Sequence, residues 1–362
     1  MGMRAWAATR KGLFELLHEG RAGWRVGRVS FLGEPVSMLL TPGPGHAGER
    51  LFAALNLGHF GVKLHASDDG GQQWQELLAP SYPAQPEGIE GPEWKLRQIW
   101  SLERDGQSLW CGTHPGGLFQ SQDGGRQWAL DLGLWNRAER LEWFGGGYDW
   151  PGIHSICPHP QREGELLLAL SSGGLWNRAS ADSPWEARGE GLLAEYMPPE
   201  RQAELNVQDP HRVVRCASQP EVLWCQHHCG LWRSADGGLH WQRLQGPVSS
   251  FGFAAVAHPT DPLTAWFVPA RKDECRVPVE ASLCVQRTRD GGQSFEVLRE
   301  GLPASHCYDL VYRHGLAADA SGTHLLMGST TGGLWASDDG GDHWQDLALR
   351  LPPIYALRFE GA

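Results

Sequence analysis

Histidines recur at the ends of predicted strands throughout this chain. The sequence contains 16 His among 362 residues, and several stand where a short apolar run starts or stops. Neutral imidazole is a good ligand for transition metals, and rings from separate segments can share one ion. The sequence therefore suggests a divalent transition metal of unknown identity. The candidate metal ligands are His59, His114, His154, His227 and His228.

A second set of polar residues could bind and convert a substrate beside such a metal. Guanidinium, imidazole, amide and phenol groups suit a small polar molecule, and the candidates are Arg97, His211, Arg212, Gln226, Arg271 and Tyr308. His211 is also a further candidate metal ligand, and Gln226 could orient a metal-bound side chain through a hydrogen bond. The candidates for acid or base are Glu142, Tyr148 and Asp149. Because a bound metal can activate water, this set predicts hydrolysis or elimination on a small polar substrate or saccharide.

Other interpretations of the histidines stay open. They could be hydrogen-bonded fillers of a polar channel, or bind an anionic ligand when protonated. The run from Cys225 to Cys229 could form a zinc knot, although its spacing suits a strand and a tight turn better.

An octet with the pattern S-x-D-x-G-x-x-W recurs along the chain and supplies the scaffold. Its Asp can accept hydrogen bonds from backbone N–H groups of a turn, and its glycines can adopt a positive φ. Each copy stands between short apolar runs, which predicts the tip of a β-hairpin. The five good copies are 67–74, 121–128, 234–241, 288–295 and 337–344.

The aromatic residues that close these hairpins divide the chain into seven units of roughly 50–57 residues. The series, with two weaker hairpins included, is Trp24, Trp74, Trp128, Trp185, Trp241, Phe295 and Trp344. Each unit offers four short strands, a regularity that a β-sandwich would not produce. We therefore expect an all-β chain that forms one seven-bladed β-propeller domain over residues 1–362, with four antiparallel strands per blade.

The two ends of the chain fit a closed ring. The first unit, within residues 4–31, lacks an inner strand, and the final run 354–359 matches one. We predict that this run completes the first blade, which would remove free sheet edges. The other inner strands are predicted at 36–40, 99–102, 153–157, 213–216, 251–257 and 308–312.

The long connections all belong to one face of the predicted propeller. They are 78–97, 131–152, 192–211 and 269–282. Loops on a rigid scaffold commonly carry function, so we expect the site on this face, over the central channel. The alternative is that these loops only plug the channel.

The octet resembles the Asp-box, or BNR repeat, of β-propellers that include sialidases, some glycoside hydrolases, sortilin-like domains and photosystem assembly factors. Longer stretches resemble a bacterial group of cytoplasmic BNR-repeat proteins that are labelled glycosyl-hydrolase-like or exo-sialidase-like. These stretches are 58–65, 140–147, 151–156, 226–228 and 308–314. The resemblance spans nearly the whole chain. It implies the seven-bladed fold and no settled reaction.

A sialidase-type glycoside hydrolase is the less favoured enzyme. Such enzymes clamp a carboxylate with three arginines, for which Arg97, Arg212 and Arg271 are the candidates, with Tyr308 or Tyr355 nearby. The expected R-I-P sequence is absent at 33–36, and the sialidase ring normally has six blades.

A non-catalytic binding or assembly propeller is the main alternative. It would hold a peptide, glycan or protein partner on the same face. Its aromatic anchors would be Trp94, Trp100, Trp143 and Trp150.

The composition limits the partners and the compartment. A formal net charge of -11 argues against nucleic acid, and no apolar run reaches membrane length. No signal peptide is recognised at the N-terminus, so we expect a cytoplasmic protein whose eight Cys are reduced. The alternative is an exported protein with one or two disulfides, for which Cys275 and Cys284 are the first candidates.

Overall fold

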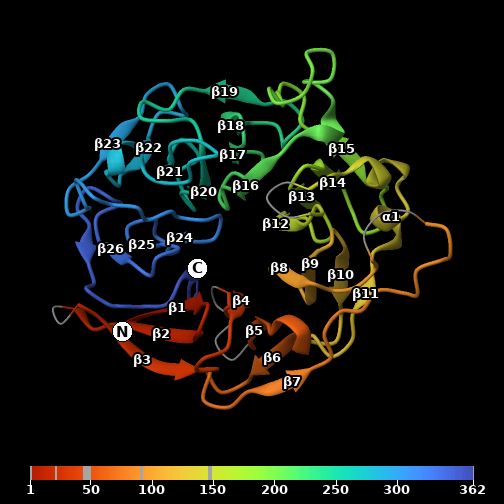
Figure 1. Ribbon diagram of the computed structural model, residues 1–362, viewed down its shortest axis with the longest axis horizontal. Helices are drawn as coiled ribbons and strands as arrows, with labels where there is room; N and C mark the ends of the chain where they lie inside the picture. The colour runs from red at the N-terminus through yellow and green to blue at the C-terminus, as the bar shows by residue number, and fades with distance from the viewer. Residues whose placement is uncertain (1, 21–22, 44–49, 90–92, 146–148, 362) are drawn as a thin grey trace.

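The computed structural model describes residues 2–20, 23–43, 50–89, 93–145 and 149–361. These residues form seven four-stranded antiparallel sheets arranged around one axis, a seven-bladed β-propeller (Figure 1). The predicted fold class is therefore confirmed.

Each blade runs from an inner strand at the axis to an outer strand at the rim. Blade 1 contains β28 (Ile354–Phe359), β1 (Met3–Thr9), β2 (Gly12–His18) and β3 (Trp24–Ser30). Blade 2 contains β4 (Val36–Leu40), β5 (Leu51–Asn56), β6 (Val62–Ser67) and β7 (Gln75–Leu77). Blade 3 contains β8 (Gln98–Asp105), β9 (Ser108–His114), β10 (Leu118–Ser121) and β11 (Ala129–Leu130). Blade 4 contains β12 (Ile153–Pro158), β13 (Leu166–Leu170), β14 (Gly174–Arg178) and β15 (Glu186–Arg188).

The remaining blades repeat this order. Blade 5 contains β16 (Pro210–Arg215), β17 (Leu223–His227), β18 (Gly230–Ser234) and β19 (Gln242–Leu244). Blade 6 contains β20 (Gly252–Ala257), β21 (Ala265–Pro269), β22 (Val285–Thr288) and β23 (Glu296–Leu298). Blade 7 contains β24 (Leu316–Ala318), β25 (Leu325–Gly328), β26 (Leu334–Ser337) and β27 (Gln345–Asp346).

Short helices occur only in the connections of the described chain. They are α1 (Leu132–Trp135) and the 3-10 turns η2 (Gly58–Phe60), η3 (Ala138–Glu142), η4 (Leu205–Val207) and η5 (Val279–Ala281). No helix among the described residues is both long and apolar enough to span a lipid bilayer.

The burial of a strand depends on its distance from the axis. Strands β13 and β17 are buried along their whole length, whereas the outer strand β7 is mostly exposed. A strand covered on both faces must be apolar throughout, and this explains the run Leu166–Leu170. The core therefore lies between neighbouring blades.

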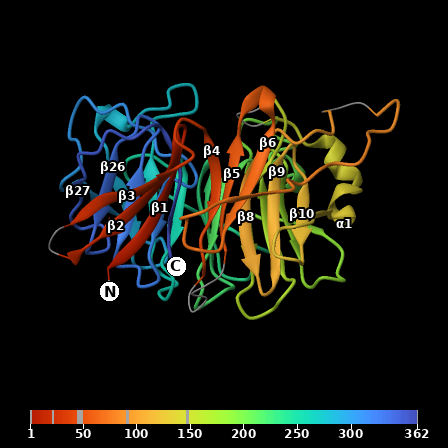
Figure 2. The same cartoon turned by 90° about the horizontal axis from the view of Figure 1, so that it is seen from below.

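The ring closes through the two ends of the sequence, as predicted. β28 pairs with β1 in antiparallel register, with Ala5 opposite Phe359 and Ala7 opposite Leu357. Figure 2 shows both ends in this region. The closure provides β1 with a partner at its axial edge, so this edge is not left free.

The recurring octets form tight turns at the rim. In the last copy, Ser337 Oγ lies 2.9 Å from Asp339 Oδ1, and Asp339 Oδ1 also accepts the backbone N–H of His343 at 2.9 Å. In the first copy, Gly71 has φ +83, and a Cβ there would lie 2.6 Å from the Trp6 ring. The glycine is therefore required both by the turn and by the approach to the neighbouring blade.

The inner strands of blades 1 to 6 each carry a β-bulge near the loop-rich face. The residues that fall out of register are Tyr355, Ser37, Trp100, His154, His211 and Phe253. A bulge re-aims a side chain, so this irregularity presents one residue per blade near the axis.

Blade 7 departs from the prediction. Its inner strand is β24 (Leu316–Ala318), and the predicted strand at 308–312 is wrong. The preceding segment leaves its own sheet to follow β28, since the His314 carbonyl accepts the Leu357 N–H at 2.8 Å. Tyr312, Arg313 and His314 consequently face the channel as a loop.

Candidate metal centre in the axial cavity

A cavity of about 810 Å³ lies where the seven blades meet. Each blade contributes to its lining, for example through Tyr355, Ser37, Trp100, Ser172, His211, Phe253 and Tyr312 in blade order. Residues of three of the four long loops also line it, which places its opening on the predicted face. The loops therefore surround a cavity and do not simply plug the channel.

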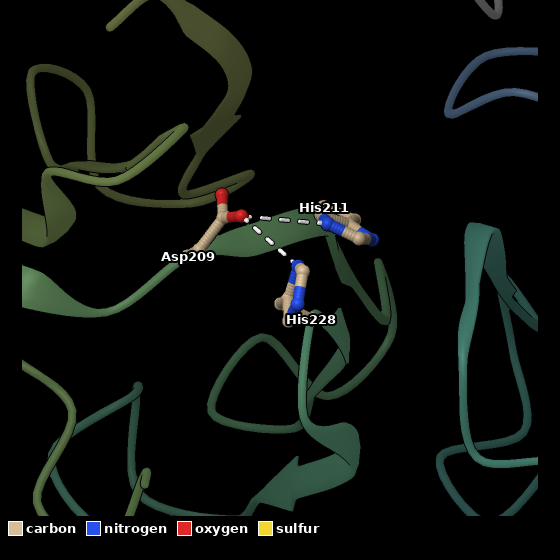
Figure 3. A group of neighbouring side chains, drawn as sticks. All are labelled: Asp209, His211 and His228. Carbon is tan, nitrogen blue, oxygen red and sulfur yellow. Dashed lines mark ion pairs between the residues drawn. The ribbon is translucent and has the colours of Figure 1, made fainter. Parts of the chain in front are cut away.

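Three potential metal ligands gather on the blade 5 wall of this cavity. Asp209 directly precedes β16, His211 lies at the bulge of β16, and His228 follows β17. Their side chains converge in Figure 3, with Asp209 Oδ2 3.5 Å from His211 Nε2 and 3.4 Å from His228 Nδ1. The three ligand atoms all lie within 4.8 Å of one another.

Hydrogen bonds from other elements orient the members of this cluster. Nδ1 of His211 lies 2.6 Å from the carbonyl oxygen of Gly252 in blade 6. A carbonyl oxygen can only accept, so Nδ1 carries the proton and Nε2 presents its lone pair to Asp209. The other carboxylate oxygen, Oδ1, accepts the Ser172 backbone N–H at 3.1 Å. Oδ2 is thereby left facing the two imidazoles.

The charges of the cluster are set by burial and by its own contacts. Burial opposes the charge of Asp209, but His211 and His228 outweigh it and hold its pKa well below the ordinary value. Burial lowers the pKa of His211 despite the nearby carboxylate. Burial also disfavours the charged form of His228, yet Asp209 raises its pKa overall. When no metal is bound, His228 is therefore the histidine of the cluster that is expected to be protonated.

Two of the three distances between these ligand atoms fit a transition metal. Ligand bonds of about 2.0–2.1 Å at a tetrahedral angle place neighbouring ligand atoms roughly 3.3–3.5 Å apart. Oδ2 lies 3.5 and 3.4 Å from the two imidazole nitrogens. Two histidines and one carboxylate also leave further coordination positions for water or substrate. The His211–Gly252 bond is the kind of outer contact that fixes a ligating imidazole.

The predicted histidines do not all join this cluster. His227 is fully buried, and its ring nitrogens face the backbone N–H groups of Asp209 at 3.1 Å and Cys229 at 3.0 Å. Burial lowers its pKa to about 3. The ring therefore supports the backbone at the end of β17 and is not free to bind a metal.

Three more predicted ligands lie apart from the cluster. His114 is buried, and its Nε2 donates to the Trp150 carbonyl at 2.8 Å. His154 is fully buried behind Trp100, with ring centroids 5.5 Å apart. His59 is exposed in η2, where it stacks on Phe60. The chain thus brings His211 and His228 together and leaves the others elsewhere.

The predicted substrate-binding residues also lie apart from one another. Arg97 is exposed and paired with Glu93, Arg271 is exposed, and Tyr308 is 61% exposed. Gln226 is buried, where its Nε2 donates to the Ser250 carbonyl at 3.0 Å and ties blade 5 to blade 6. Arg212 lies in β16 and is not among the residues that line the cavity. The three arginines therefore form no carboxylate clamp.

Two of the three predicted acids or bases, Glu142 and Asp149, do not line the cavity. Glu142 is exposed and accepts from Asn206 Nδ2 at 3.2 Å, and Asp149 is exposed as well. Tyr148 lies outside the described residues. Phe144 and Gly145 of the same loop do line the cavity.

Asp209 is the member of the cluster that the sequence analysis missed. A usable signal was its position two residues before His211, because alternate residues of extended backbone share a face. The bulge in β16 hides this relationship, since it changes the direction of His211 relative to a regular strand. Arg313 was also not among the candidates, although it lines the cavity and packs 4.8 Å from the Trp100 ring.

Comparison with known proteins shows likeness of fold. The chain resembles an ancestral GH74 enzyme, at 16% identity and a TM-score of 0.57 over 86% of this chain and 38% of that one. It resembles YCF48 from Cyanidioschyzon merolae, at 13% identity and a TM-score of 0.56 over 93% and 89% of the chains. A structure of YCF48 bound to a D1 peptide matches at 14% identity and a TM-score of 0.53 over 86% and 82%.

These likenesses define the propeller and no activity, because the identities are low. The chain spans only 38% of the GH74 enzyme. No protein-family model matches the sequence. No curated protein matches it either.

Proposed function

We propose that this protein is a metal-dependent enzyme whose ion is held by Asp209, His211 and His228. The observation that carries the proposal is the convergence of Asp209 Oδ2 with two imidazole nitrogens at 3.5 and 3.4 Å. The Gly252 carbonyl turns the lone pair of His211 toward the carboxylate. Two lone pairs that face each other are unfavourable unless a proton or a metal ion lies between them.

The proposed reaction class is hydrolysis or elimination on a small polar substrate or a saccharide. A metal bound through three protein ligands can lower the pKa of a coordinated water. The chain supplies the rest of the site, because Trp100, Phe253 and Tyr312 offer apolar surfaces next to polar groups such as Asn56 and Arg10. Ligand cavities combine these features in the same way.

Arg10 is a clear candidate for contact with the substrate. It lies in the turn between β1 and β2 and lines the cavity. Within the described part of the chain, its guanidinium makes no hydrogen bond or ion pair. A guanidinium in this position is available to bind an oxygen of the ligand.

Elemental analysis is the direct test. Protein purified without a His-tag and supplemented with zinc, manganese, iron or copper should retain about one equivalent of one metal. His211→Ala and His228→Ala should each lose it. His59→Ala is the matched control, because His59 is an exposed imidazole on the same face and should leave the metal in place.

A metal-free wild type after supplementation would reject the metalloenzyme. The next candidate would then be the binding propeller, which one specific observation favours. Large apolar side chains on the loop-rich face are exposed, including Phe60 at 72%, Leu141 at 69% and Trp150 at 40%. Of the four predicted anchors, Trp100 and Trp143 are instead buried, and the Trp143 Nε1 donates to Asn206. Peptide and glycan arrays with a Trp150→Ala variant would test that function.

We also propose that the chain is a cytoplasmic member of the BNR-repeat group. The hydrogen bonds in its octet turns and its eight free cysteines support this. Cell fractionation with an antibody against the native protein would test the location.

A further inference from the structure

Several buried nitrogen atoms near the axis have no hydrogen-bond partner among the described residues. Two come from the inner strands of blades 4 and 5, and one comes from the loop that leads into blade 7. His154 Nε2, Arg212 Nε and His314 Nε2 are all buried and lack a hydrogen-bond partner among the described residues. His154 is fully buried and His314 is 8% exposed. Leaving a buried polar group without a partner is unfavourable, so these atoms point to a ligand.

The hydrogen bonds of Ser155 identify His154 as a donor. Ser155 Oγ accepts the backbone N–H of Val213 at 3.2 Å and Nη1 of Arg212 at 3.5 Å, which together use its two lone pairs. Its own hydroxyl proton is therefore donated to Nδ1 of His154, which lies 3.0 Å away. A neutral imidazole that accepts at Nδ1 carries its proton at Nε2. His154 consequently directs a buried N–H group at a point where no protein acceptor lies.

Arg212 brings a positive charge to the same place without a carboxylate of its own. Its Nη1 lies 3.4 Å from the His154 carbonyl oxygen and 3.5 Å from Ser155 Oγ, both of which are neutral. The nearby carboxylate, Glu103, is already bound by Arg358 through two hydrogen bonds.

Neither His154 nor His314 compensates the positive charge of Arg212. Burial, followed by the charges of Arg212 and Arg358, holds the pKa of His314 well below its usual range. Burial and the charge of Arg313 do the same for His154. Both rings are therefore neutral, and the positive charge of Arg212 persists. Arg313 also lies near Asp209 of the metal cluster, so Arg212 is the clearest source of uncompensated positive charge.

We infer that a small inorganic anion binds on the propeller axis between Arg212, His154 and His314. A water molecule could accept the His154 N–H, but it would leave the charge of Arg212 uncompensated. An anion satisfies both needs at once, because charge-assisted hydrogen bonds to guanidinium are stronger than neutral ones. This site is separate from the proposed metal centre and does not depend on it.

Two measurements test the inference together. Crystals soaked in bromide should show an anomalous peak within hydrogen-bond distance of His154 Nε2 and the Arg212 guanidinium. In solution, chloride should raise the melting temperature by roughly 2 °C over gluconate, a much larger anion, at constant ionic strength. A parallel series in phosphate distinguishes a halide site from one that accepts oxyanions.

The matched variants are Arg212→Met and Arg126→Met. Arg126 is an exposed arginine in a rim turn, and its removal should leave the chloride effect unchanged. Arg212→Met should abolish the effect. If Arg212→Met does not fold, the bromide experiment on the wild type decides alone. The absence of an anomalous peak, or a melting temperature with the same anion dependence in both variants, would overturn the inference.

Discussion

His211 in blade 5 is oriented by Gly252 in blade 6, whose carbonyl oxygen lies 2.6 Å from the imidazole Nδ1. Gly252 is the first residue of β20, and a Cβ there would lie 2.4 Å from the Val268 carbonyl oxygen. The contact therefore depends on a glycine that lets two backbones approach closely. Through it, the neighbouring blade decides which imidazole nitrogen is available to a cation.

Metal binding should weaken as the pH falls, because His228 must lose its proton to act as a ligand. Asp209 raises the pKa of His228 in the metal-free protein, although burial opposes this. Below that raised pKa, affinity should fall roughly tenfold per pH unit. Competition with a chelating dye across the pH range would measure it. A pH-independent affinity would contradict the assignment of His228 as a ligand.

The stability of the metal-free protein should change with pH in the opposite direction around His228. Its folded pKa exceeds the unfolded value of about 6.5, so its contribution is fully present below that pH. The contribution is lost as the pH rises through the folded pKa. Asp209 has a depressed pKa, and its contribution is lost only as the pH falls through that low value. Urea unfolding of wild type and His228→Ala at each pH should show a difference that shrinks at alkaline pH.

Gly71→Ala should destabilise the protein more than Gly33→Ala does. Both glycines have a positive φ, at +83 and +92. An added Cβ at Gly71 meets the Trp6 ring at 2.6 Å, whereas nothing lies within 4 Å at Gly33. The difference isolates the steric contact, for which we expect about 1–3 kcal/mol in chemical denaturation. Equal losses would show that backbone strain alone accounts for the effect.

Arg178→Met should be strongly destabilising, because it leaves the buried carboxylate of Asp131, in the connection between blades 3 and 4, without its cation. Arg178 Nη1 lies 2.9 Å from Asp131 Oδ2, and both side chains are nearly buried. Asp131 Oδ1 also accepts from the Trp185 Nε1 at 3.0 Å. Breaking such a pair typically costs about 3–5 kcal/mol. Arg162→Met, at an exposed pair, is the control and should cost little.

Deletion of the residues after Pro353 should greatly lower the melting temperature, since it removes β28 from blade 1. Deletion of only Gly361 and Ala362 provides the control, because both follow the strand. Calorimetry on the two truncated proteins makes the comparison. An unchanged melting temperature without β28 would show that closure contributes nothing to stability.

The blade count could be predicted because each octet turn is local and needs only a few residues. Ser337, Asp339 and Gly341 satisfy one another within a single hairpin. The strand of blade 7 could not be predicted in this way, because its start depends on the distant pairing of His314 with β28. The site was harder still. Asp209 and His211 meet only because a bulge and a carbonyl from another blade set their directions.

The pairing of β1 with β28 also has a consequence for folding during synthesis on the ribosome. β1 emerges first, yet its partner at the axis, β28, is the last strand of this sequence to be translated. Blades 2 to 7 can fold as they are synthesised, whereas β1 of blade 1 lacks its partner at the axis until β28 is available. Since every blade lines the cavity, its wall is finished only at that final step. A ligand bound there would therefore report that the ring has closed.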